Sequence, residues 1–334
     1  MEIRSYTQND YPAIFSIWNE CRIRNEILFR PLTQRYFEEK FLSAKVYEEP
    51  FLLVAEDKGT IIGFIAGSRP HEFLNGQSET NTPGYLDALM VRKFSRGKGV
   101  GSMLLNALEE AMRRAGKSFL DVSSLSPVNK DWIIPGTPGH EHNNMPGIDD
   151  QSPAFAFLQK RGYEVRAREV AMYLDLSTYH TSPEVEQKRE RLKSMDIVAG
   201  RYDVNENCEW DEMCNRVGSE YWRKVLKDET ASPEPRPIFA ARTKGHIVGF
   251  TGPADVQPNG RGWFTGICTD PWYEKMGIAT VLFNDLMCEF IRLGAQYSSL
   301  FTGTDNHAQR LYLKTGFRPA RQFAMLRKEL RRGL

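Results

Sequence analysis

The feature that most constrains the fold of this chain is an internal repeat, because the same order of elements occurs twice along the sequence. Each copy begins with a short strand and a helical stretch, continues with three extended runs, and passes through a glycine-containing turn into an amphipathic helix. A strand, a short helix and a last strand end each copy. Since the chain has 334 residues and single domains usually have about 100 to 200, we expect two similar domains.

Two short motifs align the copies. RGKGVG, which contains Gly99, aligns with EKMGIA, which contains Gly277, and the two glycines are 178 residues apart. The later motifs KRGY and KTGF place Gly162 opposite Gly316, 154 residues apart. The first copy is therefore 24 residues longer between its two motifs.

The irregular segment after Ser123 is the only place with room for these extra residues. We expect an enlarged loop at 124–151 that covers or shapes the first cleft, since loops of this length are usually functional or disordered. The expected domains are 1–176, with this loop, and 196–334. The segment 177–195 between them is charged on most faces and is expected to be a linker or a connecting helix.

The apolar pattern within each copy indicates strands and helices that share a core. In the first copy, three runs rich in β-branched and aromatic residues predict an antiparallel meander, and DKG between the first two is a hairpin sequence. The helix after each glycine turn has an apolar stripe on one face. The stripes are Leu104, Leu105, Leu108 and Met112 in the first copy, and Leu282, Phe283, Leu286 and Phe290 in the second.

Composition excludes several classes of protein. The chain has 44 basic and 43 acidic residues, so it has no overall attraction to nucleic acid or anionic lipid. No apolar run reaches the ~18 residues of a membrane-spanning helix, and the start lacks the apolar stretch of a secretory signal. Five scattered cysteines without CxxC spacing indicate free thiols and no zinc site. We expect a cytoplasmic protein without nucleic-acid or membrane partners; its oligomeric state stays open.

RGKGVG is typical of a turn that binds phosphate. A turn at a helix N-terminus presents unpaired N–H groups and the positive end of the helix dipole. Gly97, Gly99 and Gly101 allow a ligand to approach the backbone closely, and Arg96 and Lys98 supply positive charge. The spacing is neither that of a P-loop nor that of a dinucleotide site. By itself the motif fits a strand-to-helix turn without a ligand equally well.

With the elements around it, the motif resembles those of the GNAT superfamily of acetyl-coenzyme A dependent N-acetyltransferases. The first copy carries the phosphate motif of that family at Val91, Arg96, Gly99 and Gly101. The second carries the later motif at Asn306, Ala308, Leu311, Tyr312, Lys314, Gly316 and Phe317. The resemblance covers nearly the whole chain outside the linker. It implies an α/β (α+β) fold of two tandem GNAT-like domains, each with a mixed, mostly antiparallel central sheet flanked by helices.

The resemblance also implies roles for particular residues. In this family the pyrophosphate of the coenzyme lies on the amides of the glycine-rich turn, and the strand residue before the turn donates its amide to the thioester carbonyl. The residues that match as cofactor-binding are Val91, Arg96, Gly97, Lys98, Gly99, Val100 and Gly101 in the first copy, and Thr269, Lys275, Gly277, Ala279 and Asn306 in the second. Tyr312 matches the tyrosine that protonates the departing thiolate. The alternative for Tyr312 is a core aromatic residue.

The two copies depart from the family pattern at different points. Leu158 in the first copy stands where Tyr312 stands in the second, and Ser152 stands where Asn306 stands. In the second copy, Glu274 replaces the usual Arg or Gln of the turn. The first copy therefore lacks the usual acid and the second has a less favourable phosphate turn. We expect catalysis in the second copy, with the first or both as open alternatives.

The resemblance implies an N-acetyltransferase that moves an acetyl group from acetyl-coenzyme A to a small-molecule or peptide amine by direct attack, without a metal. Asp87, Glu56 and Asp255 are candidate bases in the meander strands, and the sequence selects none of them. His140 and His142 lack a third ligand, which favours a solvated or cleft-lining loop over a metal site. The alternative function is a coenzyme A binding, sensing or scaffold protein in which one or both halves are catalytically degenerate.

Overall fold

The computed structural model describes residues 1–43, 45–73 and 75–330, and the chain divides into two compact units. Unit 1 comprises Met1–Ala171 together with Ala320–Leu334, and unit 2 comprises Met172–Pro319. The expected boundaries of 1–176, 177–195 and 196–334 follow the repeat in the sequence. The compact units differ from them because the last strand of the chain belongs to unit 1 and the connecting segment belongs to unit 2. Residues 331–334 of the expected second domain lie outside the described residues.

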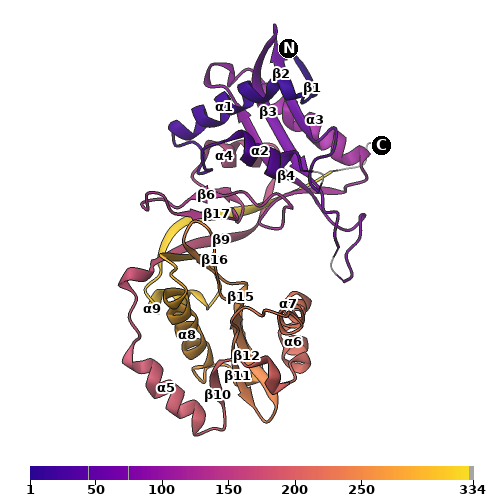
Figure 1. Ribbon diagram of the computed structural model, residues 1–334. Coiled ribbons are helices and arrows are strands. Elements are labelled where there is room, and N and C mark those ends of the chain that lie inside the picture. Colours follow the sequence, from indigo (N-terminus) through magenta and orange to yellow (C-terminus); the bar gives the residue numbers. More distant parts are fainter. Residues whose placement is uncertain (44, 74, 331–334) are drawn as a thin grey trace. The chain divides into compact units, whose positions relative to one another are not determined.

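Unit 1 contains a mixed, mostly antiparallel sheet flanked by helices (Figure 1). Its helices are α1 (Tyr11–Ile23), α2 (Gln34–Phe41), α3 (Val100–Arg114) and α4 (Pro153–Lys160). Its strands are β1 (Glu2–Ser5), β2 (Leu52–Asp57), β3 (Thr60–Ser68), β4 (Gly84–Val91), β5 (Phe119–Val122), β6 (Trp132–Ile133), β7 (Glu141–His142), β8 (Ile148–Asp149), the first part of β9 (Glu164–Asp175) and most of β17 (Arg318–Glu329). The sheet has the order β1-β2-β3-β4-β5-β17, in which only β4 and β5 are parallel.

The C-terminal strand β17, yellow in Figure 1, completes the sheet of unit 1. It pairs antiparallel with β5, where Arg327 stands opposite Asp121 and forms hydrogen bonds of 2.7 and 2.8 Å with its carboxylate. It also pairs with β8 of the enlarged loop. The apolar residues Phe323 and Leu326 of this strand are buried. A strand pattern does not specify which edge the strand joins, so this pairing could not be predicted from the sequence.

Unit 2 repeats the order of elements of unit 1, but the counterpart of β4 is divided into two strands. Its helices are α5 (Pro183–Lys193), α6 (Asp211–Val217), α7 (Glu220–Thr230), α8 (Ile278–Arg292) and α9 (Gln309–Lys314). Its strands are β10 (Val198–Arg201), β11 (Phe239–Thr243), β12 (His246–Gly252), β13 (Asp255–Val256), β14 (Arg261–Trp263), β15 (Gly266–Thr269) and β16 (Tyr297–Gly303). The helical stretch expected near the start of the second copy is two helices, because Gly218 adopts a φ of +71° and the Ser219 side chain caps α7.

Both apolar stripes are confirmed as core. Leu104, Leu105, Leu108 and Met112 of α3 are fully buried, as are Leu282, Phe283, Leu286 and Phe290 of α8. Burying each of these side chains stabilises its unit by about 1.5 to 3 kcal/mol. Gly84 and Gly262, which the repeat aligns, let the helix approach the sheet: a methyl group there would lie 2.8 Å from Met112 and 2.7 Å from Phe290. Within the described ranges, no helix is both long and apolar enough to cross a membrane.

In each unit, two parallel strands pair only at their beginnings and then diverge. β4 pairs with β5 only at Gly84 and Tyr85, and β14 pairs with β16 only at Arg261 and Gly262. After this point, β4 pairs on one side only, with β3. In unit 2, the strand that follows β14 is β15, which pairs on one side only, with β12. The backbone on the other side of these strands therefore faces a gap that can hold a ligand.

Candidate active site

The amides of Val91 and Thr269 face these gaps. The amide of Arg92 donates to a carbonyl of β3 (2.8 Å), so the alternation of an antiparallel ladder turns the N–H of Val91 away from β3. In the same way, the amide of Asp270 donates to β12 (2.9 Å), and the N–H of Thr269 points away from that strand. Each unit therefore has a backbone donor at the end of a strand, directed toward the gap.

The turns that follow these strands have the same backbone conformation. Gly97 and Gly99 have φ values of +73° and +84°, and their counterparts Lys275 and Gly277 have +63° and +102°. Gly99 and Gly277 are the N-caps of α3 and α8. Lys275 adopts the left-handed region although residues with a Cβ atom rarely do. The second turn thus keeps its shape despite its substitutions, and both helices present their first amides as a phosphate site requires.

The Arg96 side chain makes hydrogen bonds within unit 1. Its guanidinium binds both carboxylate oxygens of Glu26 (2.7 and 2.6 Å), and its Nε donates to the carbonyl of Val91 (2.9 Å). The Arg96 guanidinium lowers the pKa of the Glu26 carboxyl. Arg96 therefore ties the end of β4 to the segment after α1. Its counterpart in unit 2, Glu274, is exposed and carries the opposite charge, so it cannot form an equivalent ion pair with a carboxylate.

The other predicted residues of the first turn lie around the start of α3. Lys98 is exposed. A methyl group placed on Gly97 or on Gly99 would have no described atom within 4 Å, apart from those of the adjacent residues in the chain. Val100 is buried, and a methyl group on Gly101 would lie 3.5 Å from the ring of Phe157. The first turn is therefore open on its glycine side.

In unit 2, one cleft of about 690 Å³ brings the predicted residues together. Thr269, Lys275, Gly277, Ala279 and Asn306 all line it. Its size is within the usual range of sites for small molecules and cofactors. Four cationic side chains and two carboxylates also line it, namely Lys188, Lys275, Arg310 and Lys314, and Glu184 and Glu274. The excess of positive charge suits a ligand with several phosphate groups.

Tyr312 lies on α9 at the edge of this cleft. Leu311 of this helix lines the cleft, and so do Ala308 and Thr315 on either side of the helix, but Tyr312 does not. Its ring is 7% exposed and packs against Phe283, with ring centres 5.2 Å apart. Burial raises the pKa of Tyr312 to about 12. No described residue forms a hydrogen bond with its hydroxyl, so the ring belongs to the core while the hydroxyl keeps a donor for a ligand.

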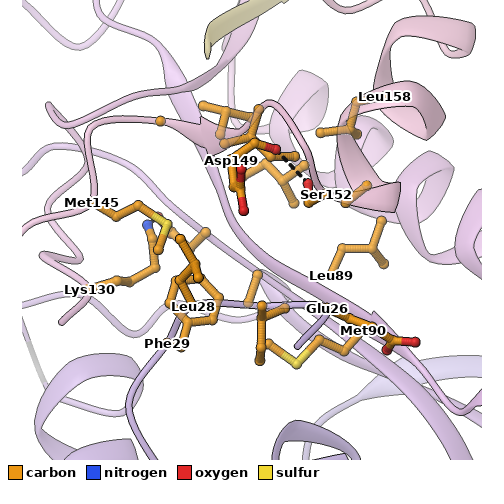
Figure 2. Close-up of a pocket in the computed structure, with 18 residues that line it drawn as sticks. Glu26, Leu28, Phe29, Leu89, Met90, Lys130, Met145, Asp149, Ser152 and Leu158 are labelled. Atoms are coloured by element: carbon orange, nitrogen blue, oxygen red, sulfur yellow. Dashed lines mark hydrogen bonds and ion pairs between the residues drawn. The ribbon is translucent and has the colours of Figure 1, made fainter. Parts of the chain in front are cut away.

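In unit 1, a mostly apolar cavity of about 100 Å³ lies beside β4 (Figure 2). Leu89 and Met90 of β4 line it, but no residue of the glycine turn does. The enlarged loop contributes Lys130, Met145 and Asp149, and burial raises the pKa of the Asp149 carboxyl. The loop thus shapes the first cleft.

Leu158 lines the same cavity at the position that Tyr312 has in unit 2. The backbone confirms this alignment, because the carbonyl of Leu158 accepts from Tyr163 (3.1 Å) and that of Tyr312 accepts from Phe317 (3.0 Å). Ser152, the counterpart of Asn306, also lines the cavity and donates to the carbonyl of Asp149, as Figure 2 shows. No tyrosine hydroxyl lines this cavity among the described residues.

Of the three candidate bases, Asp87 lines the cavity of unit 1. Its side chain is fully buried, and Oδ1 accepts from the Ser126 hydroxyl and from Lys130 Nζ (3.1 Å). Its Oδ2 has no partner among the described residues. Glu56 binds Arg4, and Asp255 binds Arg236. A register shift between β3 and β4 lies at Asp87, so simple strand alternation does not give the orientation of its side chain.

Lys130 and Lys188 could not be recognised as site residues from the sequence. Lys130 is 43 residues from its partner Asp87, and Lys188 is one of many charges in α5. No local pattern distinguishes either lysine. Across the described ranges, no three His, Cys, Asp or Glu side chains gather as a metal site. His142 is buried and stacks on Trp132, with ring centres 5.9 Å apart.

The chain is similar to known proteins over both of its repeats. The model of the Acetyltransferase (GNAT) family matches residues 11–130 and 204–317. An acetyltransferase of Pectobacterium atrosepticum is 30% identical over 117 residues, which are 35% of this chain and 70% of that protein.

Solved structures with the same fold include a region of a larger enzyme and a tandem GNAT protein. The GCN5-related glucosamine N-acetyltransferase region of a fungal multidomain β-N-acetylglucosaminidase matches 98% of this chain with a TM-score of 0.70 and 17% identity, and this chain spans 38% of that one. A tandem GNAT protein from the clavulanic acid biosynthesis pathway matches over all of this chain and 99% of its own, with a TM-score of 0.55 and 15% identity. With two matched regions that cover most of its length, this chain belongs to the GNAT family of acetyltransferases.

Proposed function

We propose that this protein transfers an acetyl group from acetyl-coenzyme A to a primary amine by direct attack on the thioester, and that unit 2 carries the reaction. The GNAT fold supports acyl transfer in general. The observation that carries the specific proposal is the cleft of unit 2, in which Thr269, Gly277 and Asn306 line one basic space. Their backbone donors and the positive charge fit the carbonyl and the phosphates of an acyl-coenzyme A.

Each part of the cleft has a chemical task. When the amine attacks, negative charge develops on the carbonyl oxygen, and the N–H of Thr269 stabilises that charge. The first amides of α8, after Gly277, hold the pyrophosphate. The proton that the amine loses ends on the coenzyme sulfur, and Tyr312 assists this transfer. Because the pKa of Tyr312 is about 12, above the ~8.5 of a thiol, it acts more as a hydrogen-bond donor to the sulfur than by full proton transfer.

A second function is favoured for unit 1 by Leu158. This side chain lines the cavity where a tyrosine hydroxyl would be needed, while the glycine turn before α3 keeps its phosphate-binding shape. Unit 1 is therefore proposed to bind coenzyme A without turnover, in a sensing or scaffold role.

Release of free thiol from acetyl-coenzyme A tests both functions. The acceptor panel contains glucosamine, a polyamine, an amine antibiotic and a peptide with a free N-terminus. We expect thiol release with at least one amine, its loss in Gly277→Glu, and its retention in Gly99→Glu. No release with any amine would leave the coenzyme-binding role alone, and loss confined to Gly99→Glu would assign catalysis to unit 1.

A further inference from the structure

The segment between the repeats is a fixed part of unit 2. The guanidinium of Arg189 on α5 binds the carboxylate of Asp285 on α8 (2.6 and 3.2 Å). The hydroxyl of Tyr179 donates to Asn284 of the same helix (2.6 Å), and Leu192 is fully buried. Both side chains of the ion pair are largely shielded from solvent, so α5 is firmly held beside α8.

This packing places Lys188 over the glycine turn of unit 2. A methyl group on Gly277 would lie 3.2 Å from the Cγ and Cδ atoms of Lys188. The ammonium lies 3.5 Å from the hydroxyl of Thr280, in the first turn of α8, and 3.5 Å from Glu184. Both contacts are long for a hydrogen bond, and the described residues offer this ammonium no shorter one. A weakly held cation thus lies at the start of α8.

The turn of unit 2 has no cation at the position where the turn of unit 1 carries Lys98. Lys98 of unit 1 aligns with Met276, and Glu274 adds an exposed carboxylate nearby. The turn itself offers one positive side chain, Lys275, and one negative side chain, Glu274, so its side chains carry no net positive charge. Lys188, which comes from outside the repeat, restores a positive charge at this place.

We propose that Lys188 binds the pyrophosphate of coenzyme A in unit 2, so that the connecting segment is part of the cofactor site. This inference rests on the proposed function, because it assumes that the cleft of unit 2 holds the coenzyme. It assigns Lys188 to the pyrophosphate and not to the 3′-phosphate, since the ammonium lies beside the turn. The four-carbon stem lets the ammonium move from Thr280 to a phosphate oxygen without moving α5.

Calorimetric titration of the full chain with coenzyme A tests the proposal, in a Gly99→Glu background that removes binding at unit 1. We expect Lys188→Gln to weaken binding about tenfold, as loss of a charge-assisted hydrogen bond does at a partly exposed site. Lys188→Gln should weaken the binding of dephospho-coenzyme A, which lacks the 3′-phosphate, by the same factor. Lys188→Arg keeps most of the affinity. Lys193→Gln, an exposed residue of the same helix, is the matched control and leaves binding unchanged.

The possible failures are distinguishable. If Lys188→Gln binds normally while Gly277→Glu does not bind, the role of Lys188 is wrong and the cofactor site stands. If Lys188→Gln binds more tightly, the lysine stem covers the turn and opposes the coenzyme. A loss seen with coenzyme A but not with its dephospho form would move Lys188 to the 3′-phosphate. If Gly277→Glu also binds normally, the proposed site in unit 2 fails, and the inference fails with it.

Discussion

Replacing Tyr312 by Phe separates the packing of the ring in the core from the role of the hydroxyl as a hydrogen-bond donor. The ring packs against Phe283 and Phe317, with ring centres 5.2 and 6.1 Å apart, and Phe preserves these contacts. The hydroxyl is mostly buried and has no hydrogen-bond partner among the described residues, so its removal breaks no bond within the protein. We therefore expect the free energy of unfolding to change by less than about 1 kcal/mol.

Activity should respond quite differently to the same change. A positioned hydrogen-bond donor at the reacting centre contributes roughly 100- to 1,000-fold to a rate, and a water molecule that takes its place reduces the loss to about tenfold. We expect kcat for thiol release to fall within this range while the Kd for coenzyme A, measured by calorimetry, changes less than about threefold. Leu158 cannot supply the missing donor from unit 1. Full kcat in Tyr312→Phe would refute the assignment of Tyr312.

The pH dependence of stability provides an independent check on the burial of Tyr312. Its pKa is about 12 in the folded protein and about 10 in the unfolded chain, so the folded state resists ionisation. The unfolded state loses its proton first, and stability falls as the pH rises from about 10 to 12, by about 3 kcal/mol in total. Phe has no proton to lose. Alkaline denaturation should therefore show Tyr312→Phe gaining about this amount relative to the natural protein, and parallel curves would contradict the burial.

Three further changes test other features. Gly277→Ala should lower the free energy of unfolding by about 1 to 2 kcal/mol and weaken coenzyme binding, because φ is +102° at this residue of the turn. Gly294→Ala, at φ +84° in open space after α8, should lower the stability alone, and equal affinities of the two variants for coenzyme A would contradict this. Trp132→Ala should lower the free energy of unfolding by about 3 to 5 kcal/mol in denaturant titrations, since this fully buried ring packs on Phe323, and a loss below about 1 kcal/mol would be inconsistent with that packing. Removing 320–334 should abolish hydrogen-exchange protection in β5 but not in β12, and unchanged protection in β5 would argue against the pairing with β17.

Local patterns predicted the elements well because their causes are local. The apolar stripes of α3 and α8, and the strand-turn-helix order around Gly99 and Gly277, follow from residue spacing and from glycine. The repeat aligned Leu158 with Tyr312, and the matching hydrogen bonds at the helix ends confirm that alignment.

Features that depend on distant contacts were not predictable. Arg96 fits a phosphate motif in sequence, but the structure pairs it with Glu26, 70 residues away. Lys188 approaches Gly277 only because α5 packs on α8. The position of β17 was hidden for the same reason, since an amphipathic strand fits any open sheet edge of the right length.

The position of β17 has a consequence for synthesis on the ribosome. The partner of this strand, β5, ends at Val122, about 200 residues before the strand itself, so at roughly 5 to 20 residues per second it waits about 10 to 40 s for its neighbour. Unit 2, which ends at Pro319, is complete before the chain releases its last strand. The half of the protein that is made first is therefore the half that finishes folding last. Until then the edge of β5 presents unpaired N–H and C=O groups to any other strand in reach.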